Sequence, residues 1–218
     1  MNQVTPSLYL ERLLNLYDER RRRFQVWFTL LVVGTLLLFF FVVIPYFTLL
    51  GNRLDCQLNN AQCSQIEAAL LNERLTQVTT SWGNIPISTA EVVALSPLLY
   101  AVGFAAVAMQ LHQLMQLRQG IDRQTQREAL SIDTSLVTPL LLDRRHWGDF
   151  GLGLAALLTP PLLCLYTMRL IYLRRGVLRL ELPYAQSARF YLLIYAVSAG
   201  LIGFSLLRLL FGPRRQDE

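Results

Sequence analysis

The sequence has no lysine, only two histidines and three cysteines, and four long apolar stretches that lack any acidic residue. A haem held by paired imidazoles across a bundle, or a metal site of several histidines, needs more ligands than His112 and His146 provide. The apolar stretches also lack paired carboxylates and glycine-rich phosphate loops. We therefore predict a non-enzymatic protein without catalytic residues, a cofactor or a metal.

All 20 basic residues are arginine, and the net charge is +5. A GC-rich genome accounts for this choice, but arginine also binds phosphate through two parallel hydrogen bonds, whereas lysine acts as a point charge. The arginines lie beside the apolar stretches, where positive charges set the orientation of membrane helices. We therefore expect the lipid bilayer, through its anionic headgroups, as a partner, and no nucleic acid.

Apolar runs dominate the rest of the chain. At about 1.5 Å per residue, about 20 apolar residues cross the roughly 30 Å hydrocarbon layer of a bilayer. The connections at 51–91 and 118–149 are too short for a soluble catalytic domain. We predict an all-α integral membrane protein with four transmembrane helices, built on the runs Phe24–Leu50, Val92–Leu111, Phe150–Met168 and Phe190–Leu207.

A cluster of four arginines, Arg20, Arg21, Arg22 and Arg23, directly precedes the first run. Such clusters remain in the cytoplasm, so the N-terminus is expected inside. The first run is too long for a cleavable signal and should remain as an anchor. The predicted order is a cytoplasmic amphipathic helix at 1–23, a span at 24–50, an extracytoplasmic loop at 51–91, a span with a cytoplasmic extension at 92–117, a cytoplasmic loop at 118–149, a span at 150–173, an Arg-rich loop at 174–187, a span at 188–211 and a cytoplasmic tail at 212–218.

The N-terminal segment has helical amphipathic spacing. Leu10, Leu13, Leu14 and Tyr17 share one face, opposite charged residues. A helix with this pattern lies on the inner leaflet or binds a cytoplasmic partner.

The loop at 51–91 contains Cys56 and Cys63. If the first span exits outward, this loop faces an oxidising compartment, so we predict a disulfide between these two cysteines; the alternative is two free thiols. Residues 64–78 have helical spacing and residues 81–86 are typical of a turn. The chain has no Asn-x-Ser/Thr glycosylation motif. With the arginine usage, this favours a multi-pass protein of the bacterial inner (plasma) membrane.

The loop after the third run is rich in arginine, although four crossings place it outside. In a rival topology, Phe150–Met168 is a re-entrant hairpin bent at Thr159-Pro160-Pro161, which returns that loop to the cytoplasm. We favour four crossings because a re-entrant segment needs cover from protein or water that so small a chain can hardly supply alone. In either topology, we expect lipid headgroups to contact Arg144, Arg145, Arg174 and Arg175 as well as the cluster before the first run.

Small residues recur four positions apart within the predicted spans. Such pairs let helix backbones approach each other in lipid. The contacts lie within one chain or between copies in a homo-oligomer. The pairs are Ala101 with Ala105, Gly151 with Ala155, Ala196 with Gly200, and Ala199 with Gly203.

These observations favour an anchor, sensor or accessory subunit that docks a protein partner through its cytoplasmic surfaces. The alternative is a homo-oligomeric channel or membrane-permeability effector, for example in a stress or defence system, with its pore between copies. A third hypothesis, a small intramembrane enzyme, would use Asp143, His146 and Asp149 near the inner interface.

Overall fold

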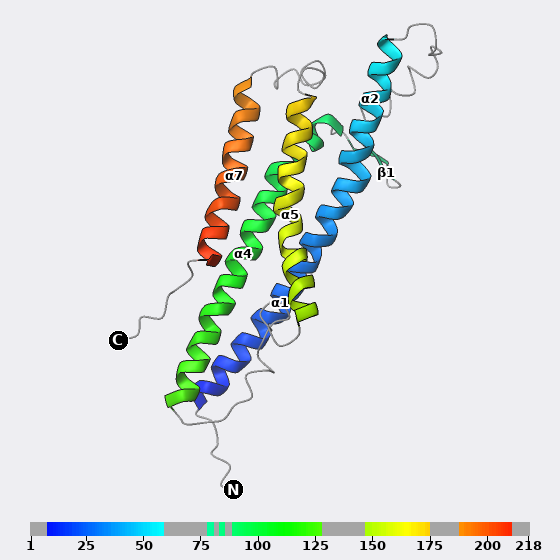
Figure 1. The fold of residues 1–218 in the computed structure, drawn as a ribbon. Helices are drawn as coiled ribbons and strands as arrows, with labels where there is room; N and C mark the ends of the chain where they lie inside the picture. Colours follow the sequence, from blue (N-terminus) through cyan, green and yellow to red (C-terminus); the bar gives the residue numbers. More distant parts are fainter. Residues whose placement is uncertain are drawn as a thin grey trace. The chain divides into compact units, whose positions relative to one another are not determined.

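A computed structural model describes residues 8–58, 78–80, 83–85, 89–127, 147–174 and 188–210. It consists of long helices and one small hairpin (Figure 1). Four helical stretches are long and apolar enough to cross a membrane, namely Leu8–Asn52, Thr89–Arg127, Gly151–Leu173 and Arg189–Leu210. The prediction of an all-helical protein with four such helices is therefore confirmed. The elements are α1 (Leu8–Leu38), η1 (Phe39–Val43), α2 (Ile44–Leu58), β1 (Val78–Thr80), β2 (Gly83–Ile85), α4 (Thr89–Arg127), α5 (Trp147–Leu173) and α7 (Ala188–Leu210).

Large apolar side chains are exposed along all four of these stretches. Examples are Phe41 at 74% exposure, Leu99 at 55%, Leu165 at 54% and Leu192 at 65%. A water-soluble monomer rarely exposes so much contiguous apolar surface, whereas a lipid-facing helix does so by necessity. The exposed apolar side chains therefore agree with a multi-pass membrane protein.

The charged N-terminal segment and the first apolar run form one continuous helix. Residues 1–23 were expected to form a separate helix, but α1 begins at Leu8 and runs unbroken into the apolar run. A short π-helix, η1, connects α1 to α2, with the Ile44 amide donating to the Phe39 carbonyl. Residues 8–23 are therefore the first turns of the first membrane helix and do not form a separate helix.

Helix α4 is longer than predicted, and α5 is unbroken. The second span was expected to end at residue 117, yet α4 continues to Arg127. Helix α5 passes through Pro160 and Pro161 without reversing, so the structure does not form the re-entrant hairpin of the rival topology. At about 1.5 Å per residue, the 27 residues of α5 span roughly 40 Å, enough to cross a bilayer.

The region between the first two spans is described only in part. Strands β1 and β2 pair antiparallel, with Val78 opposite Ile85. Val78 was expected at the end of a surface helix at 64–78, but it belongs to a strand; the remainder of that segment lies outside the described residues. The backbone of Cys56 lies in α2, whereas its side chain and all of Cys63 lie outside the described residues. The disulfide therefore has no structural support and stays a prediction.

The chain divides into two compact units. The first comprises Met1–Val32, Gly103–Pro160 and Leu201–Glu218, and the second comprises Val33–Val102 and Pro161–Gly200. Within the second unit, all four membrane helices contribute to one apolar core. In lipid, such a core is stabilised by van der Waals packing and not by the hydrophobic effect. Its buried residues are Phe39, Val43, Tyr46, Leu50, Ala90, Val93, Ala94, Ile171 and Tyr191.

Candidate functional site

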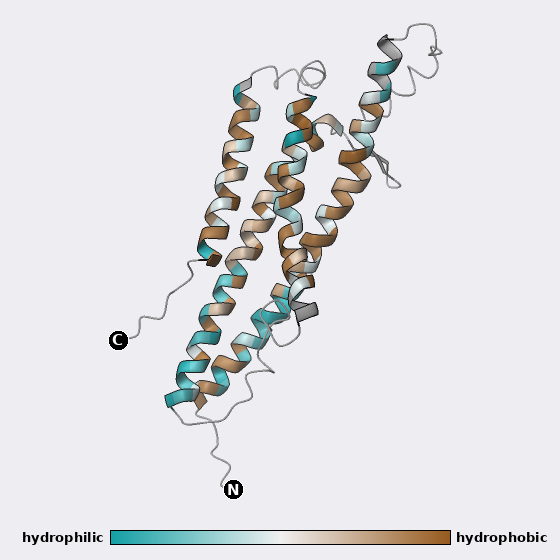
Figure 2. Ribbon diagram, viewed as in Figure 1, coloured by the Kyte–Doolittle hydropathy of each residue, from teal (hydrophilic) through white to brown (hydrophobic). Residues whose placement is uncertain are grey.

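In the first unit, the N-terminal part of α1 pairs with the C-terminal part of α4 (Figure 1). Leu31 lies beside Gly103, Arg20 donates a hydrogen bond to Gln113, and Arg118 lies close enough to Tyr17 for an electrostatic interaction. Residue numbers rise along one helix as they fall along the other, so the two helices are antiparallel. Figure 2 shows hydrophilic residues gathered toward the paired ends and hydrophobic ones along the rest of both helices.

The pairing follows a spacing of four and three residues. On α4, Val107, Leu111, Leu114, Arg118, Ile121 and Thr125 are buried or half-buried and follow one another at intervals of four and three residues, although other residues such as Ala108 and His112 are buried too. On α1, Leu10, Leu14, Tyr17, Arg21, Phe24, Phe28 and Leu31 are buried or half-buried at the same intervals. This alternation is typical of a coiled coil, in which side chains of one helix insert between those of the other. The two helices therefore continue beyond the apolar runs as a pair, which we call the stalk: residues 8–23 and 112–127.

The stalk explains why α4 outlasts its apolar run. Ile121 is fully buried, and the buried Thr125 hydroxyl donates to the Ile121 carbonyl at 2.8 Å. Each part has 16 residues and so extends about 24 Å. Ion pairs join residues four positions apart on each helix, Arg22 with Asp18 at 3.0 Å on the exposed side of α1 and the half-buried Arg118 with Asp122 at 3.9 Å on α4.

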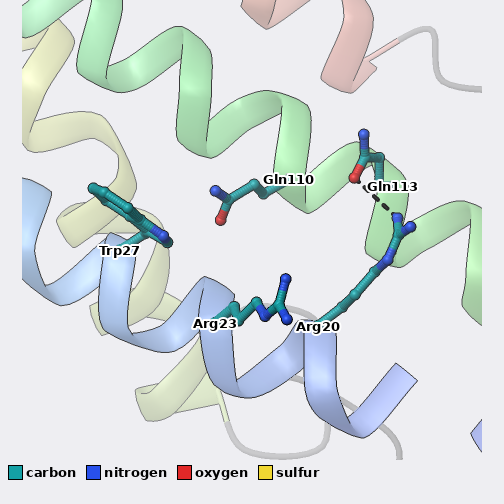
Figure 3. A pocket seen from close by; sticks show the side chains of 5 residues that line it. All are labelled: Arg20, Arg23, Trp27, Gln110 and Gln113. Atoms are coloured by element: carbon teal, nitrogen blue, oxygen red, sulfur yellow. Dashed lines mark hydrogen bonds between the residues drawn. The ribbon is translucent and has the colours of Figure 1, made fainter. Parts of the chain in front are cut away.

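A polar cavity of about 300 Å³ lies where the stalk meets the apolar part of the pair. Arg20, Arg23 and Trp27 line it from α1, and Gln110 and Gln113 line it from α4 (Figure 3). The Arg20 Nη1 donates to Gln113 Oε1 at 3.0 Å. Each successive lining residue of α1 lies three or four positions after the last, so one helical face presents two guanidiniums and an indole.

The polar groups of this cavity are only partly satisfied. Arg23 pairs with Glu19, yet its side chain is 72% exposed and keeps further donors free for an anion. The buried Oε1 of Gln110 has no hydrogen-bond partner. Figure 3 shows Gln110 between Trp27 and Arg23. An acceptor left unpaired in this way costs about 1–3 kcal/mol, so a ligand that donates to it gains affinity.

An apolar cavity of about 330 Å³ adjoins the polar one and shares Trp27 and Gln110 with it. At Gly103, which lines it, the two helices approach closely, because a Cβ at that position would lie 2.5 Å from Leu31 Cδ1. Together the two cavities form one cleft with a cationic, amide-lined end and an apolar end. We call it the α1–α4 cleft; its apolar end is lined by Trp27, Leu30, Leu31, Gly103, Ala106, Val107 and Gln110.

The predicted headgroup arginines have different surroundings. Arg20 and Arg23 line the α1–α4 cleft, whereas Arg22 is 79% exposed and pairs with Asp18 outside it. Arg21 is half-buried. Arg174, just beyond α5, is exposed. Arg144, Arg145 and Arg175 lie outside the described residues.

The predicted small-residue pairs also differ in exposure. Ala101 is fully buried, while Ala105 and Gly203 are half-buried. No side chain or distant backbone comes within 4 Å of where a Cβ would stand at Gly151, Gly200 or Gly203. A role for these pairs in helix packing stays a prediction. Those exposed are Gly151, Ala155, Ala196, Ala199 and Gly200.

Two polar features of the interior lie outside the cleft. His112 is 6% exposed and its Nε2 lies 3.2 Å from Gln116 Nε2. In the second unit, Cys164 is buried as expected for a packing residue, and its thiol donates to the Pro97 carbonyl at 3.3 Å.

The described part of the chain contains no cluster of three or more histidine, cysteine or acidic side chains suited to a metal ion. Asp143 and His146 lie outside the described residues, and only the backbone of Asp149 is described, so the enzyme hypothesis is not tested. The cleft was missed because Arg20 and Gln113 are 93 positions apart. The signal that could have found it is the four-three spacing on both helices. Comparisons with family models, curated proteins and solved structures found no match for this chain.

Proposed function

We propose that this chain is a non-enzymatic inner-membrane protein that anchors a partner complex, as an anchor, sensor or accessory subunit, through the stalk on the cytoplasmic side. The observation that carries the proposal is the stalk itself, a rigid antiparallel helix pair longer than the bilayer requires. Each membrane crossing uses about 20 residues, and α4 has 39. The additional turns of both helices support a role outside the lipid.

The stalk surface supports a protein partner. Leu8 is 84% exposed, Tyr9 60% and Leu16 41%, in a segment otherwise rich in charge. Tyr9 and Leu16 are seven residues apart and so share one helix face. Basic residues outnumber acidic ones on both parts of the stalk. These features favour a partner with an apolar patch inside an acidic surface.

Orientation and the outer loop complete the proposal. The arginine cluster at Arg20–Arg23 supports a cytoplasmic stalk by the positive-inside tendency, and the arginine usage supports a bacterial cell. The segment with Cys56 and Cys63 then faces the oxidising side, where the disulfide would constrain it.

The test is purification of the full chain in mild detergent from its native host, followed by mass determination of the intact complex. We expect a stoichiometric partner, which Leu16→Glu removes because it introduces a negative charge into the apolar contact. The matched control is Gln126→Glu, which adds the same charge at another exposed stalk position. A partner retained equally by both variants, or no partner at all, would overturn the proposal.

Exposed small residues favour a second candidate. Gly151, Ala155, Ala196 and Gly200 are exposed within the part of the chain that the structure describes, and such positions suit contacts between copies. They support a homo-oligomeric channel or permeability effector. If purification yields only a defined homo-oligomer, ion flux in proteoliposomes should follow, and silent proteoliposomes across ionic conditions would contradict this candidate.

A further inference from the structure

We propose that the α1–α4 cleft binds one anionic phosphoglyceride whose headgroup bears hydroxyls, of the phosphatidylglycerol class. The phosphate contacts Arg20, Arg23 and Gln113, and one acyl chain runs along the apolar end of the cleft. Arg20, Arg23 and Gln113 belong to the stalk, so this site lies at its membrane end, and Arg20 follows Leu16 by four residues on the same face of α1. Lipid binding by the purified chain requires no protein partner and can therefore be tested independently of the proposed docking function.

The shape of the cleft matches the order of groups in a phospholipid. The polar cavity begins at Arg20 and Arg23, and the apolar cavity follows one helical turn later at Trp27, Leu30 and Leu31. Both cavities open at the molecular surface, and the apolar one adjoins the apolar run that begins at Phe24. Their volumes lie at the lower end of the range of about 300–1,000 Å³ for small-molecule sites.

Charge selects the phosphate. Two guanidiniums in one cavity attract an anion and can each donate paired hydrogen bonds to phosphate oxygens. Arg20 is already oriented by its 3.0 Å hydrogen bond to Gln113, so less side-chain freedom is lost on binding. The Glu19 carboxylate, paired with Arg23, offsets part of the positive charge. A neutral sugar could accept hydrogen bonds from these donors but would not neutralise their charge, and an ammonium group would be repelled by it.

Gln110 selects the headgroup. Gln110 lines the same cavity as the two arginines, and its buried Oε1 has no partner within the described chain. Rotation of the side-chain amide brings this acceptor into the cavity, where a headgroup hydroxyl can donate to it. An ethanolamine ammonium could donate as well, but two neighbouring guanidiniums repel that charge. The glycerol headgroup therefore satisfies Gln110 without bringing a second positive charge.

Ala106 makes room for the acyl chain, because its side chain at the apolar end of the cleft is a single methyl group. Gly103, on the same helix, allows Leu31 to approach the α4 backbone. A large side chain at residue 106 would fill the space that the acyl chain requires.

Native mass spectrometry of the full chain in detergent tests the site. Added phosphatidylglycerol should bind one to one, at least about fivefold more tightly than phosphatidylethanolamine with the same acyl chains. Soluble glycerol 3-phosphate supplies the phosphate without acyl chains and should bind at least about tenfold more weakly than the lipid. The double variant R20Q/R23Q should weaken phosphatidylglycerol binding about tenfold or more, because two charge-assisted contacts are lost.

Two matched controls keep the result interpretable. R22Q removes one arginine charge outside the cleft and should change binding less than about twofold. Ala106→Phe should abolish lipid retention, while Ala199→Phe on an exposed face of α7 should leave it intact. If R20Q/R23Q does not fold, two other measurements still test the site. One compares Ala106→Phe with Ala199→Phe. The other uses Gln110→Leu, which should reduce the preference for phosphatidylglycerol over phosphatidylethanolamine. Equal loss in R22Q, no lipid preference, or glycerol 3-phosphate binding as tightly as the lipid would overturn the proposal.

Discussion

The side chain of Ser96 stabilises helix α4 at the point where Pro97 interrupts the backbone hydrogen bonds. Pro97 has no amide hydrogen, so it cannot donate to the carbonyl of Val93, four residues earlier. The fully buried Ser96 hydroxyl donates to that carbonyl instead, at 2.7 Å. The serine therefore compensates for the proline inside a membrane helix, where an unpaired carbonyl finds no water.

We predict that Ser96→Ala lowers the free energy of unfolding by about 1 kcal/mol, because the Val93 carbonyl loses its donor. Ser205→Ala is the matched control: the Ser205 hydroxyl also bonds a carbonyl of its own helix, Leu201 at 2.7 Å, but there the backbone amide also donates. Denaturation in mixed micelles measures both. In a Pro97→Ala background the cost of Ser96→Ala should shrink, and a cost that stays the same would contradict this explanation.

At the scale of the element, the stalk depends on side chains spaced four and three residues apart. Ile121 and Leu10 are both fully buried, and the antiparallel register brings the end of α4 to the beginning of α1. Outside the lipid this packing is driven by the hydrophobic effect, unlike the packing of the spans.

We predict that Ile121→Ala costs about 2 kcal/mol or more of local stability, because a buried aliphatic side chain is lost. Hydrogen exchange should then accelerate on the α4 part of the stalk and also on residues 8–20 of α1. Gln126→Ala, at an exposed position, is the control and should leave exchange unchanged. Acceleration confined to α4 would mean that the two helices do not stabilise each other.

The stalk also shows which parts of the fold could be predicted from the sequence and which could not. The four apolar runs predicted four membrane helices, because length and composition alone decide that outcome. Residues 119–127 are polar and were interpreted as loop, since their helical structure depends on contacts with α1, far away in sequence. The hydrogen bond between Arg20 and Gln113 could not be predicted either, because it joins two helices whose apolar runs were analysed separately.

At the scale of the whole molecule, the four-crossing topology requires the two ends of the first helix to lie on opposite sides of the membrane. The segment Leu8–Asn52 has 45 residues, about 68 Å of helix, roughly twice the hydrocarbon thickness. One end must therefore project well beyond the lipid. We propose that the stalk end is the cytoplasmic one, because the arginine cluster directly precedes Phe24.

We predict that Gln126→Cys reacts with a membrane-impermeant thiol reagent in inverted vesicles and not in intact spheroplasts. Gly51→Cys, near the other end of the first helix, should show the opposite pattern. The buried Cys164 should contribute little background. Reaction of both variants from the same side would contradict four crossings with an internal N-terminus.

The disulfide is tested separately. Intact mass after alkylation without reductant should show Cys56 and Cys63 unmodified, and reduction should expose two more alkylation sites. Denaturation before alkylation removes protection by burial, so Cys164 serves as the internal standard that always reacts. Alkylation of all three cysteines without reductant would show that the bridge is absent.

The central claim is that the stalk docks a protein partner in the cytoplasm, and site-specific photo-crosslinking in the native host tests it most directly. A photoreactive residue at position 16, where Leu16 is 41% exposed, should give one protein adduct, and Tyr9→Glu should abolish it. The same residue at position 192, on the exposed face of α7, should not give that adduct. Adducts to lipid or to a second copy of the chain alone from position 16 would contradict the claim.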